Sequence, residues 1–114
     1  MIEYLVLSDE IKSQLNIRNS HLIIVKQGAD VIGLGKINLD KKDISLYIEK
    51  KHQGNGYGRS LFLELIKKSK DMDLKEVYLN CLTDNYKIKK IIADFGGVHI
   101  STNNGYARYI ISLK

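Results

Sequence analysis

The chain has 114 residues, 44% of them apolar, and a formal net charge of +5 from 18 basic and 13 acidic side chains. The length predicts a single domain over 1–114, and no apolar run approaches the roughly 18 residues that cross a membrane. The basic residues are scattered and few aromatic residues accompany them, which argues against a nucleic-acid surface. One cysteine and no apolar leader favour a cytoplasmic protein.

The first half of the chain predicts mostly strands. Ser8 is a candidate cap for a helix of one or two turns over 9–15. Alternating apolar residues between polar turns predict strands at 2–7, 21–26, 31–39 and 43–49. The strands 21–26 and 31–39 are expected to form a hairpin, in which Gly33 and Gly35 mark close packing or a bulge.

The second half alternates helices and strands. Apolar residues at helical spacing predict helices over 60–72 and 84–95, the second closed by Gly96 and Gly97. Further strands are predicted at 76–82, 98–102 and 106–113. The helical crossover between them makes strands 43–49 and 76–82 parallel neighbours. The expected fold class is therefore α/β (α+β), with a single mixed, mostly antiparallel sheet.

Three glycines, Gly54, Gly56 and Gly58, stand at alternate positions between a predicted strand and a predicted helix. Main-chain N–H groups without side chains above them can close on an anion, and a helix N-terminus adds about half a positive charge. Arg59 adds a cation at the same place, so the segment predicts a site for a phosphate-bearing ligand. The alternatives are a plain tight turn and a dinucleotide-binding loop, which lacks its third glycine because Arg59 stands there.

The pattern Gln53-x-x-Gly56-x-Gly58, with a strand before it and a helix after it, resembles the signature of the GNAT superfamily of acetyl-CoA-dependent N-acetyltransferases. The resemblance covers about residues 20–114. It implies the acyl-CoA N-acyltransferase fold, here with a shortened N-terminal region, in which the two central parallel strands splay apart. It also implies an enzyme that transfers acetyl from acetyl-CoA to a primary amine by direct attack in a ternary complex.

The same resemblance implies which residues bind coenzyme A. Loop N–H groups would hold its pyrophosphate, and main-chain groups of the preceding strand would pair with its pantetheine arm. An N–H near Ile48 would stabilise the negative charge that develops on the thioester oxygen. Lys87, Lys89 and Lys90 are either solvated or near the 3′-phosphate. The implied binding residues are Leu46, Tyr47, Ile48, Gln53, Gly54, Asn55, Gly56, Tyr57, Gly58, Arg59 and Asn85.

The sequence departs from the family pattern in two places, and the first concerns catalysis. Ile92 stands where the family often has the tyrosine that protonates the leaving thiolate, so Tyr86 and Tyr109 are the candidate substitutes. Glu49 is the candidate general base, acting through a water, and Asp43 is a second. Each of these side chains has a plainer alternative, as a packed tyrosine or a solvated carboxylate.

The other departure is a short front end. About a dozen residues, 8–19, stand where the family builds a longer wall for the acceptor site, so that site is open or completed by another subunit. The acceptor is expected to be a small-molecule amine or an amine of a peptide or protein, with no metal involved. Strand 106–113 is a candidate for pairing across a homodimer.

Some alternatives stay open from the sequence alone. Cys81 alternates with Val77 and Leu79 and is expected to face the core, the alternative being an acyl-accepting thiol. His52 is either exposed or in contact with a phosphate. For the whole chain, the alternative to an active enzyme is a catalytically weak or inactive acyl-CoA-binding module of the same fold.

Overall fold

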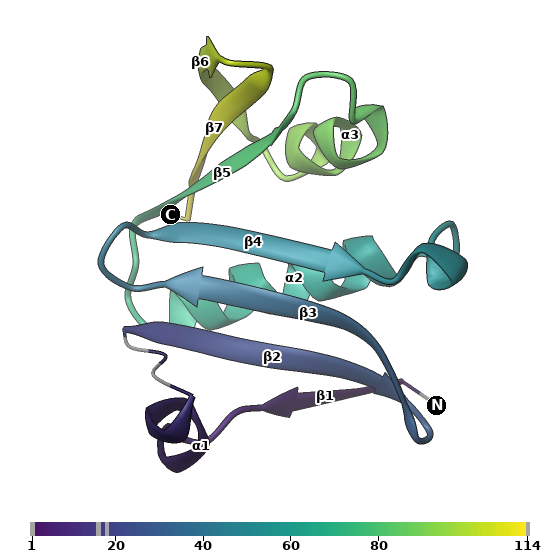
Figure 1. The fold of residues 1–114 in the computed structure, drawn as a ribbon. Helices are drawn as coiled ribbons and strands as arrows, with labels where there is room; N and C mark the ends of the chain where they lie inside the picture. The colour runs from purple at the N-terminus through teal and green to yellow at the C-terminus, as the bar shows by residue number, and fades with distance from the viewer. Residues whose placement is uncertain (1, 16, 18, 114) are drawn as a thin grey trace.

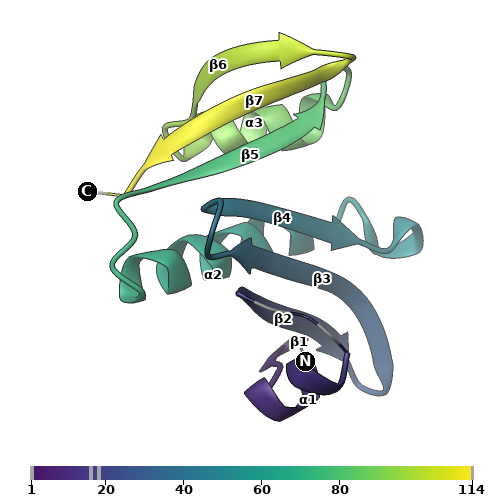
Figure 2. The same cartoon turned by 60° about the vertical axis from the view of Figure 1, so that its left-hand side comes forward.

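A mixed sheet of seven strands organises the residues that the computed structural model describes, which are 2–15, 17 and 19–113. The strand order is β1-β2-β3-β4-β5-β7-β6. Figure 1 shows α2 behind β3 and β4, and Figure 2 shows α3 behind β5 and β7. The strands are β1 (Ile2–Val6), β2 (Ser20–Gln27), β3 (Asp30–Asn38), β4 (Asp43–Ile48), β5 (Glu76–Leu82), β6 (Val98–Asn103) and β7 (Tyr106–Ser112). The helices are α1 (Asp9–Gln14), α2 (Tyr57–Asp71) and α3 (Tyr86–Asp94), with one 3₁₀ turn, η1 (Lys50–His52).

The core lies between the sheet and α2, and small residues let the two approach. Leu61 and Leu65 on α2 are fully buried against β3. A Cβ on Gly35 would meet both leucine side chains at 3.0 Å, so the expected close packing at this glycine is confirmed. The register of β2 against β3 also shifts between Val25 and Lys26, which places a bulge next to Gly33.

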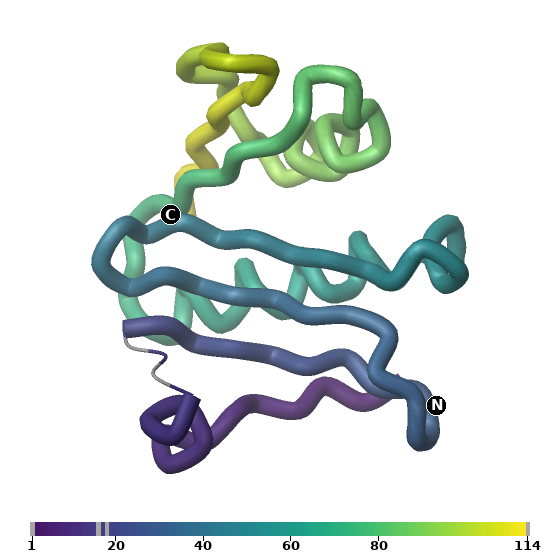
Figure 3. The backbone as a smooth tube through the Cα atoms, in the orientation of Figure 1, coloured from purple at the N-terminus to yellow at the C-terminus, as the bar shows by residue number. Residues whose placement is uncertain are grey.

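The parallel pair predicted at the centre of the sheet is confirmed, and it is very short. β4 and β5 pair only where Asp43 lies opposite Tyr78, and the N–H of Tyr78 donates to the carbonyl of Lys42 at 2.9 Å. Beyond this junction the two strands diverge, as Figure 2 and the tube in Figure 3 show. On the helix side Phe62 of α2 packs on Phe95, just past α3, with ring centroids 4.9 Å apart.

Three expectations need correction. Helix α2 begins at Tyr57 rather than at 60, because the left-handed Gly56 (φ 81°) ends the loop and caps the helix. The next helix begins at Tyr86 rather than at 84, since Asn85 is its cap. The predicted strand 106–113, observed as β7, is not at a sheet edge and cannot pair across a dimer. It lies between β5 and β6 because its Ala107 and Ile111 are buried, whereas all of β6 is exposed.

No helix in the described part of the chain is both long enough and apolar enough to span a membrane. Ser8 caps α1 as predicted, its Oγ accepting a hydrogen bond from the N–H of Ile11 at 3.3 Å. The connection between β1 and β2 runs over residues 7–19, and α1 is the one helix in the described part of it. That this front end is shorter than in the family stays a prediction.

Candidate active site

The glycine loop comes after β4 and the 3₁₀ turn η1, and it leads directly into α2. Gly54 and Gly56 have φ of 85° and 81°, the left-handed region that glycine adopts without strain. Gln53 ties the loop to the strand, because its Nε2 donates to the carbonyl of Ile48 at 2.9 Å. The loop is therefore anchored by side chains at its start and by a helix at its end, while Gly54, Asn55 and Gly56 are exposed.

The N–H groups of residues 54–59 are a continuous row of donors without acceptors. Across the described residues, no main-chain or side-chain oxygen accepts from any of them, and the first helical bond near the loop runs from Ser60 to Gly56 at 3.1 Å. Three of these groups lie in the first turn of α2, where the helix dipole is positive. Unpaired N–H groups at a helix N-terminus are what an anion site requires, and the phosphate site expected from the sequence stays a prediction.

Neither the backbone conformation nor the packing at position 58 requires a glycine. Its φ is not in the left-handed region, and a Cβ there would lie 3.9 Å from Ile48 Cγ1, an ordinary contact. A glycine inside a helix costs about 1 kcal/mol relative to alanine. The absence of a side chain at Gly58 therefore leaves space beside the unpaired N–H groups, where a ligand could approach them.

The edge of β4 that faces the gap can be assigned by alternation. The N–H of Glu49 donates to Ile32 of β3, and the carbonyl of Lys42 accepts from β5, so even-numbered residues of β4 turn their main chain to β5. No residue of β5 pairs with Leu46 or Ile48, which leaves their N–H groups facing the gap. The main chain of Tyr47 faces β3 instead, so the expected strand-like pairing narrows to Leu46 and Ile48.

The guanidinium of Arg59 is paired with a carboxylate of α3. Its Nη2 donates to Asp94 Oδ2 at 2.7 Å, which ties the first turn of α2 to the end of α3. Both side chains are nearly half exposed, so solvent screens this pair. A ligand at the loop would compete with Asp94 for the guanidinium.

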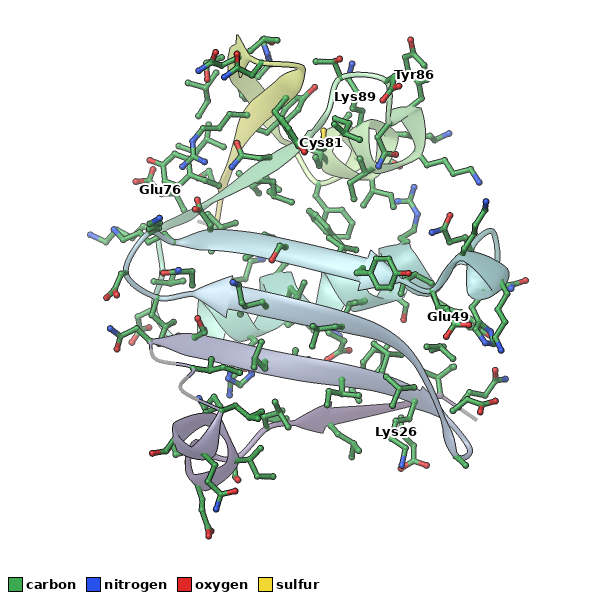
Figure 4. All side chains as sticks on the ribbon, in the orientation of Figure 1. Lys26, Glu49, Glu76, Cys81, Tyr86 and Lys89 are labelled. Atoms are coloured by element: carbon green, nitrogen blue, oxygen red, sulfur yellow. The ribbon has the colours of Figure 1, made fainter. Side chains whose placement is uncertain are left out.

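Helix α3 carries the other predicted site residues. Asn85 caps it, its Oδ1 accepting from the N–H of Ile88 at 3.2 Å. Ile92 is fully buried, so the position of the expected acid belongs to the core. Tyr86 is 74% exposed and its ring lies 5.5 Å from Lys89 Nζ. Figure 4 shows these two residues together at the outer end of α3, away from β4.

The remaining candidates divide between the ends of β4. Glu49 follows β4 directly, and its Oε1 lies 3.4 Å from Lys51 Nζ. Asp43 lies at the other end and binds Arg108, which the sequence reasoning did not single out because strand register is not visible in a sequence. His52 is half-buried, with Nε2 lacking a hydrogen-bond partner among the described residues.

Two other predicted side chains face the packed side of β5 and β7. Cys81 is buried as expected, and burial raises the pKa of its thiol although Lys89 opposes the shift. A thiol with a raised pKa is a poor nucleophile. Tyr109 packs edge-on against His99, with ring centroids 5.4 Å apart. In the described segments no group of three His, Cys, Asp or Glu side chains could hold a metal ion.

The splayed sheet with a glycine loop at the end of β4 defines an acyl-CoA N-acyltransferase fold. The family model described as "Acetyltransferase (GNAT) family" matches residues 3–96. The chain therefore belongs to the GNAT acetyltransferase family, a class of acetyl-CoA-dependent acyltransferases. No curated protein matches the sequence.

Solved structures share the fold at low sequence identity. A variant of the spermidine/spermine N-acetyltransferase SpeG from Vibrio cholerae aligns with a TM-score of 0.77 at 17% identity, covering 99% of this chain and 95% of that one. The spermidine N-acetyltransferase of the same organism, in complex with CoA and spermine, gives 0.74 at 20% identity over 92% and 73% of the chains. The N-acetyltransferase PseH of Campylobacter jejuni gives 0.76 at 13% identity over 99% of both.

Proposed function

We propose that residues 1–114 act as one N-acetyltransferase domain, which transfers acetyl from acetyl-CoA to a primary amine by direct attack in a ternary complex. The observation that carries this proposal is the row of unpaired N–H groups at 54–59 beside the open edge of β4. The diphosphate of coenzyme A supplies the anion, and the pantetheine arm lies along Leu46 and Ile48. The complex of the Vibrio cholerae enzyme with CoA, which has the same fold, supports this assignment.

The N–H of Ile48 is the proposed oxyanion donor. It faces the gap, and the carbonyl of Ile48, on the same edge of the strand, accepts from Gln53 Nε2, which fixes the end of β4 beside this donor. A fixed donor at the point where charge develops is worth about 100-fold to 1000-fold in rate. Asn85, with Oδ1 committed to the helix cap, offers its Nδ2 to the pantetheine amides.

The proposed reaction also needs a base that takes the proton of the amine and a way for the thiolate to leave. Glu49 is the proposed base through a water, since it follows β4 next to Ile48. Tyr86 is largely exposed and lies away from β4, so we do not assign it as the acid that protonates the leaving thiolate. The thiolate of coenzyme A can leave without an acid, because a thiol has a pKa near 8.5. A weakly basic acceptor is favoured, because an α-amino group near 7.7–8.0 loses its proton more easily than a lysine near 10.4.

Calorimetry with acetyl-CoA and a thiol-release assay together test the proposal. The amine panel comprises spermidine, a peptide with a free α-amino group and an aminoglycoside, and it includes spermidine because the structurally similar enzymes act on polyamines. The proposal expects binding and amine-dependent thiol release, reduced by Glu49→Gln. Lack of acetyl-CoA binding contradicts it.

A second candidate is an acyl-CoA-binding module without efficient catalysis, favoured by the buried Ile92 in place of the acid. It predicts acetyl-CoA binding without thiol release for any amine of the panel. We place either activity in the cytoplasm, because the one cysteine is a buried free thiol.

A homodimer is also proposed, with β6 as its edge in place of strand 106–113. β6 exposes Val98 and Ile100, which are 61% and 49% exposed, and it contains no lysine or proline that would guard the edge. Ultracentrifugation of the wild type and of Ile100→Lys tests this: the wild type should be dimeric and the variant monomeric. A wild type that sediments as a monomer contradicts the dimer.

A further inference from the structure

The closed end of the gap between β4 and β5 depends on very few main-chain contacts. Asp43 opposite Tyr78 is the one residue pair that joins these strands, although each strand is fully paired on its other side. Figure 2 shows the strands meeting at this end and opening toward the loop. A junction of one residue pair leaves the opening angle free unless side chains fix it.

Arg108 of β7 reaches across this junction. Its Nη2 donates to Asp43 Oδ1 at 3.1 Å, and its Nη1 donates to Asn80 Oδ1 at 3.3 Å. Its Cζ also lies 4.6 Å from the ring centroid of Tyr78. One side chain thus connects β7, β5 and β4 at the point where β4 and β5 are otherwise joined by a single pair.

The surroundings make this contact stronger than an ordinary surface ion pair. The side chains of Arg108 and Asp43 are 33% and 28% exposed, so both are about two-thirds covered. They lie on the face of the sheet opposite α2, since the alternate residues Val77 and Leu79 are buried on the helix side. The cluster is also distant from the glycine loop, about 16 Å along β4 at 3.3 Å per residue.

We propose that Arg108 is a positioning residue that sets the opening between β4 and β5 and thereby places the thioester against the N–H of Ile48. This inference rests on the proposed function. The contacts of Arg108 are with Asp43, Asn80 and Tyr78, at the end of β4 away from the loop. It thereby holds the strand that carries Ile48 against the strand across the gap. Arginine suits the task because two nitrogens of its rigid planar fork bind Asp43 and Asn80 while the guanidinium lies over the ring of Tyr78, a geometry that the point-like ammonium of lysine does not fix.

Amide hydrogen exchange tests the clamp without any substrate. In Arg108→Met the N–H of Tyr78, which bonds to Lys42, should exchange at least about tenfold faster, because local opening sets exchange. The N–H of Leu79, which faces β7, should change little. Arg108→Lys should lie between the wild type and Arg108→Met. Lys36→Met, which removes a cation from the same face without touching Asp43, is the matched control.

Kinetics with the amine of the panel that the wild type acetylates form the second arm. Arg108→Met should lower kcat about tenfold or more, because misplacing the reacting atoms by an ångström is that costly, while the acetyl-CoA dissociation constant stays within about threefold. A double-mutant cycle shows whether Asp43 acts through Arg108: Asp43→Asn should add little in the Arg108→Met background.

Two results overturn the clamp. One is exchange at Tyr78 that is unchanged in Arg108→Met; the other is exchange accelerated equally at Tyr78 and Leu79, which indicates general destabilisation. A wild type that neither binds acetyl-CoA nor releases thiol contradicts the proposed function instead, and the exchange result still decides whether Arg108 holds the junction.

Discussion

The two ends of β4 are built in different ways. At its C-terminal end the residues 54–59 offer consecutive unpaired main-chain N–H groups, so this candidate site is contiguous in the chain. At its N-terminal end the junction is assembled from side chains of β4, β5 and β7, with Asp43 and Arg108 65 residues apart. An anion can be bound by main chain and glycine alone. The junction instead depends on side chains that only the fold brings together.

The largest expected effect concerns the packing that holds the two halves of the sheet together. Phe62 is fully buried and contacts Phe95 near α3. Phe62→Ala should lower the free energy of unfolding by about 3–5 kcal/mol, because it leaves a cavity between α2 and α3. Denaturant unfolding measures this loss. The control is Leu63→Ala on the same helix, where the side chain is 39% exposed and the cost should be far smaller.

Next comes the loop itself. Gly58→Ala should leave the fold intact, because the added methyl meets only an ordinary contact and alanine favours the helix. Binding of acetyl-CoA should weaken at least about tenfold, which is about 1.4 kcal/mol, since the methyl fills the space beside the N–H row. Lys67→Ala, at an exposed position of α2 away from the loop, is the control for a substitution by alanine on the same helix. Unchanged binding in Gly58→Ala would mean that the loop does not hold the diphosphate.

Asn85 allows the structural and ligand roles of one residue to be separated. Asn85→Ala removes the cap of α3 and should cost about 1 kcal/mol of stability. Asn85→Asp keeps the capping oxygen but removes the amide donor, so it should retain stability and lose affinity for acetyl-CoA. Thermal unfolding and calorimetry on the two variants measure the roles separately. Equal affinities in the wild type and Asn85→Asp contradict a contact between Asn85 and pantetheine.

The smallest expected effect is a pH dependence that arises on β2, at His21. Burial, followed by repulsion from Lys68 and Lys12, lowers the pKa of His21 below its ordinary value. The unfolded chain therefore binds this proton first, and stability falls as pH drops below about 6.5. Thermal unfolding between pH 7 and pH 5 should show that loss. His21→Leu should reduce the slope, and Lys68→Met should reduce it partly. A slope unaffected by His21→Leu excludes this cause.

Much of the coenzyme side could be predicted from the sequence. Alternation and glycine spacing located β4, the loop and the following helix, because these features are local. The start of α2 was misplaced because Gly58 and Arg59 suit a loop as well as a first helical turn. Strand order at the C-terminal edge was also missed. Both β6 and β7 alternate, and only the burial of Ala107 and Ile111 shows which of them is inside.

The junction at the N-terminal end of β4 could not be predicted in the same way. The contact of Arg108 with Asp43 depends on the registers of two strand pairs, which no local pattern encodes. Variants at the two ends of β4 should therefore differ in what they change. Loop variants should lower the affinity for acetyl-CoA, whereas junction variants should lower kcat and speed the amide exchange of Tyr78.

The most direct test of the central claim is a titration of ¹⁵N-labelled protein with acetyl-CoA, followed by amide chemical shifts. The account predicts that the N–H signals of residues 54–59 and of Ile48 move most, while those of Val98–Asn103 in β6 stay in place. Loop amides that do not move at saturating acetyl-CoA, or shifts concentrated on β6, would contradict it.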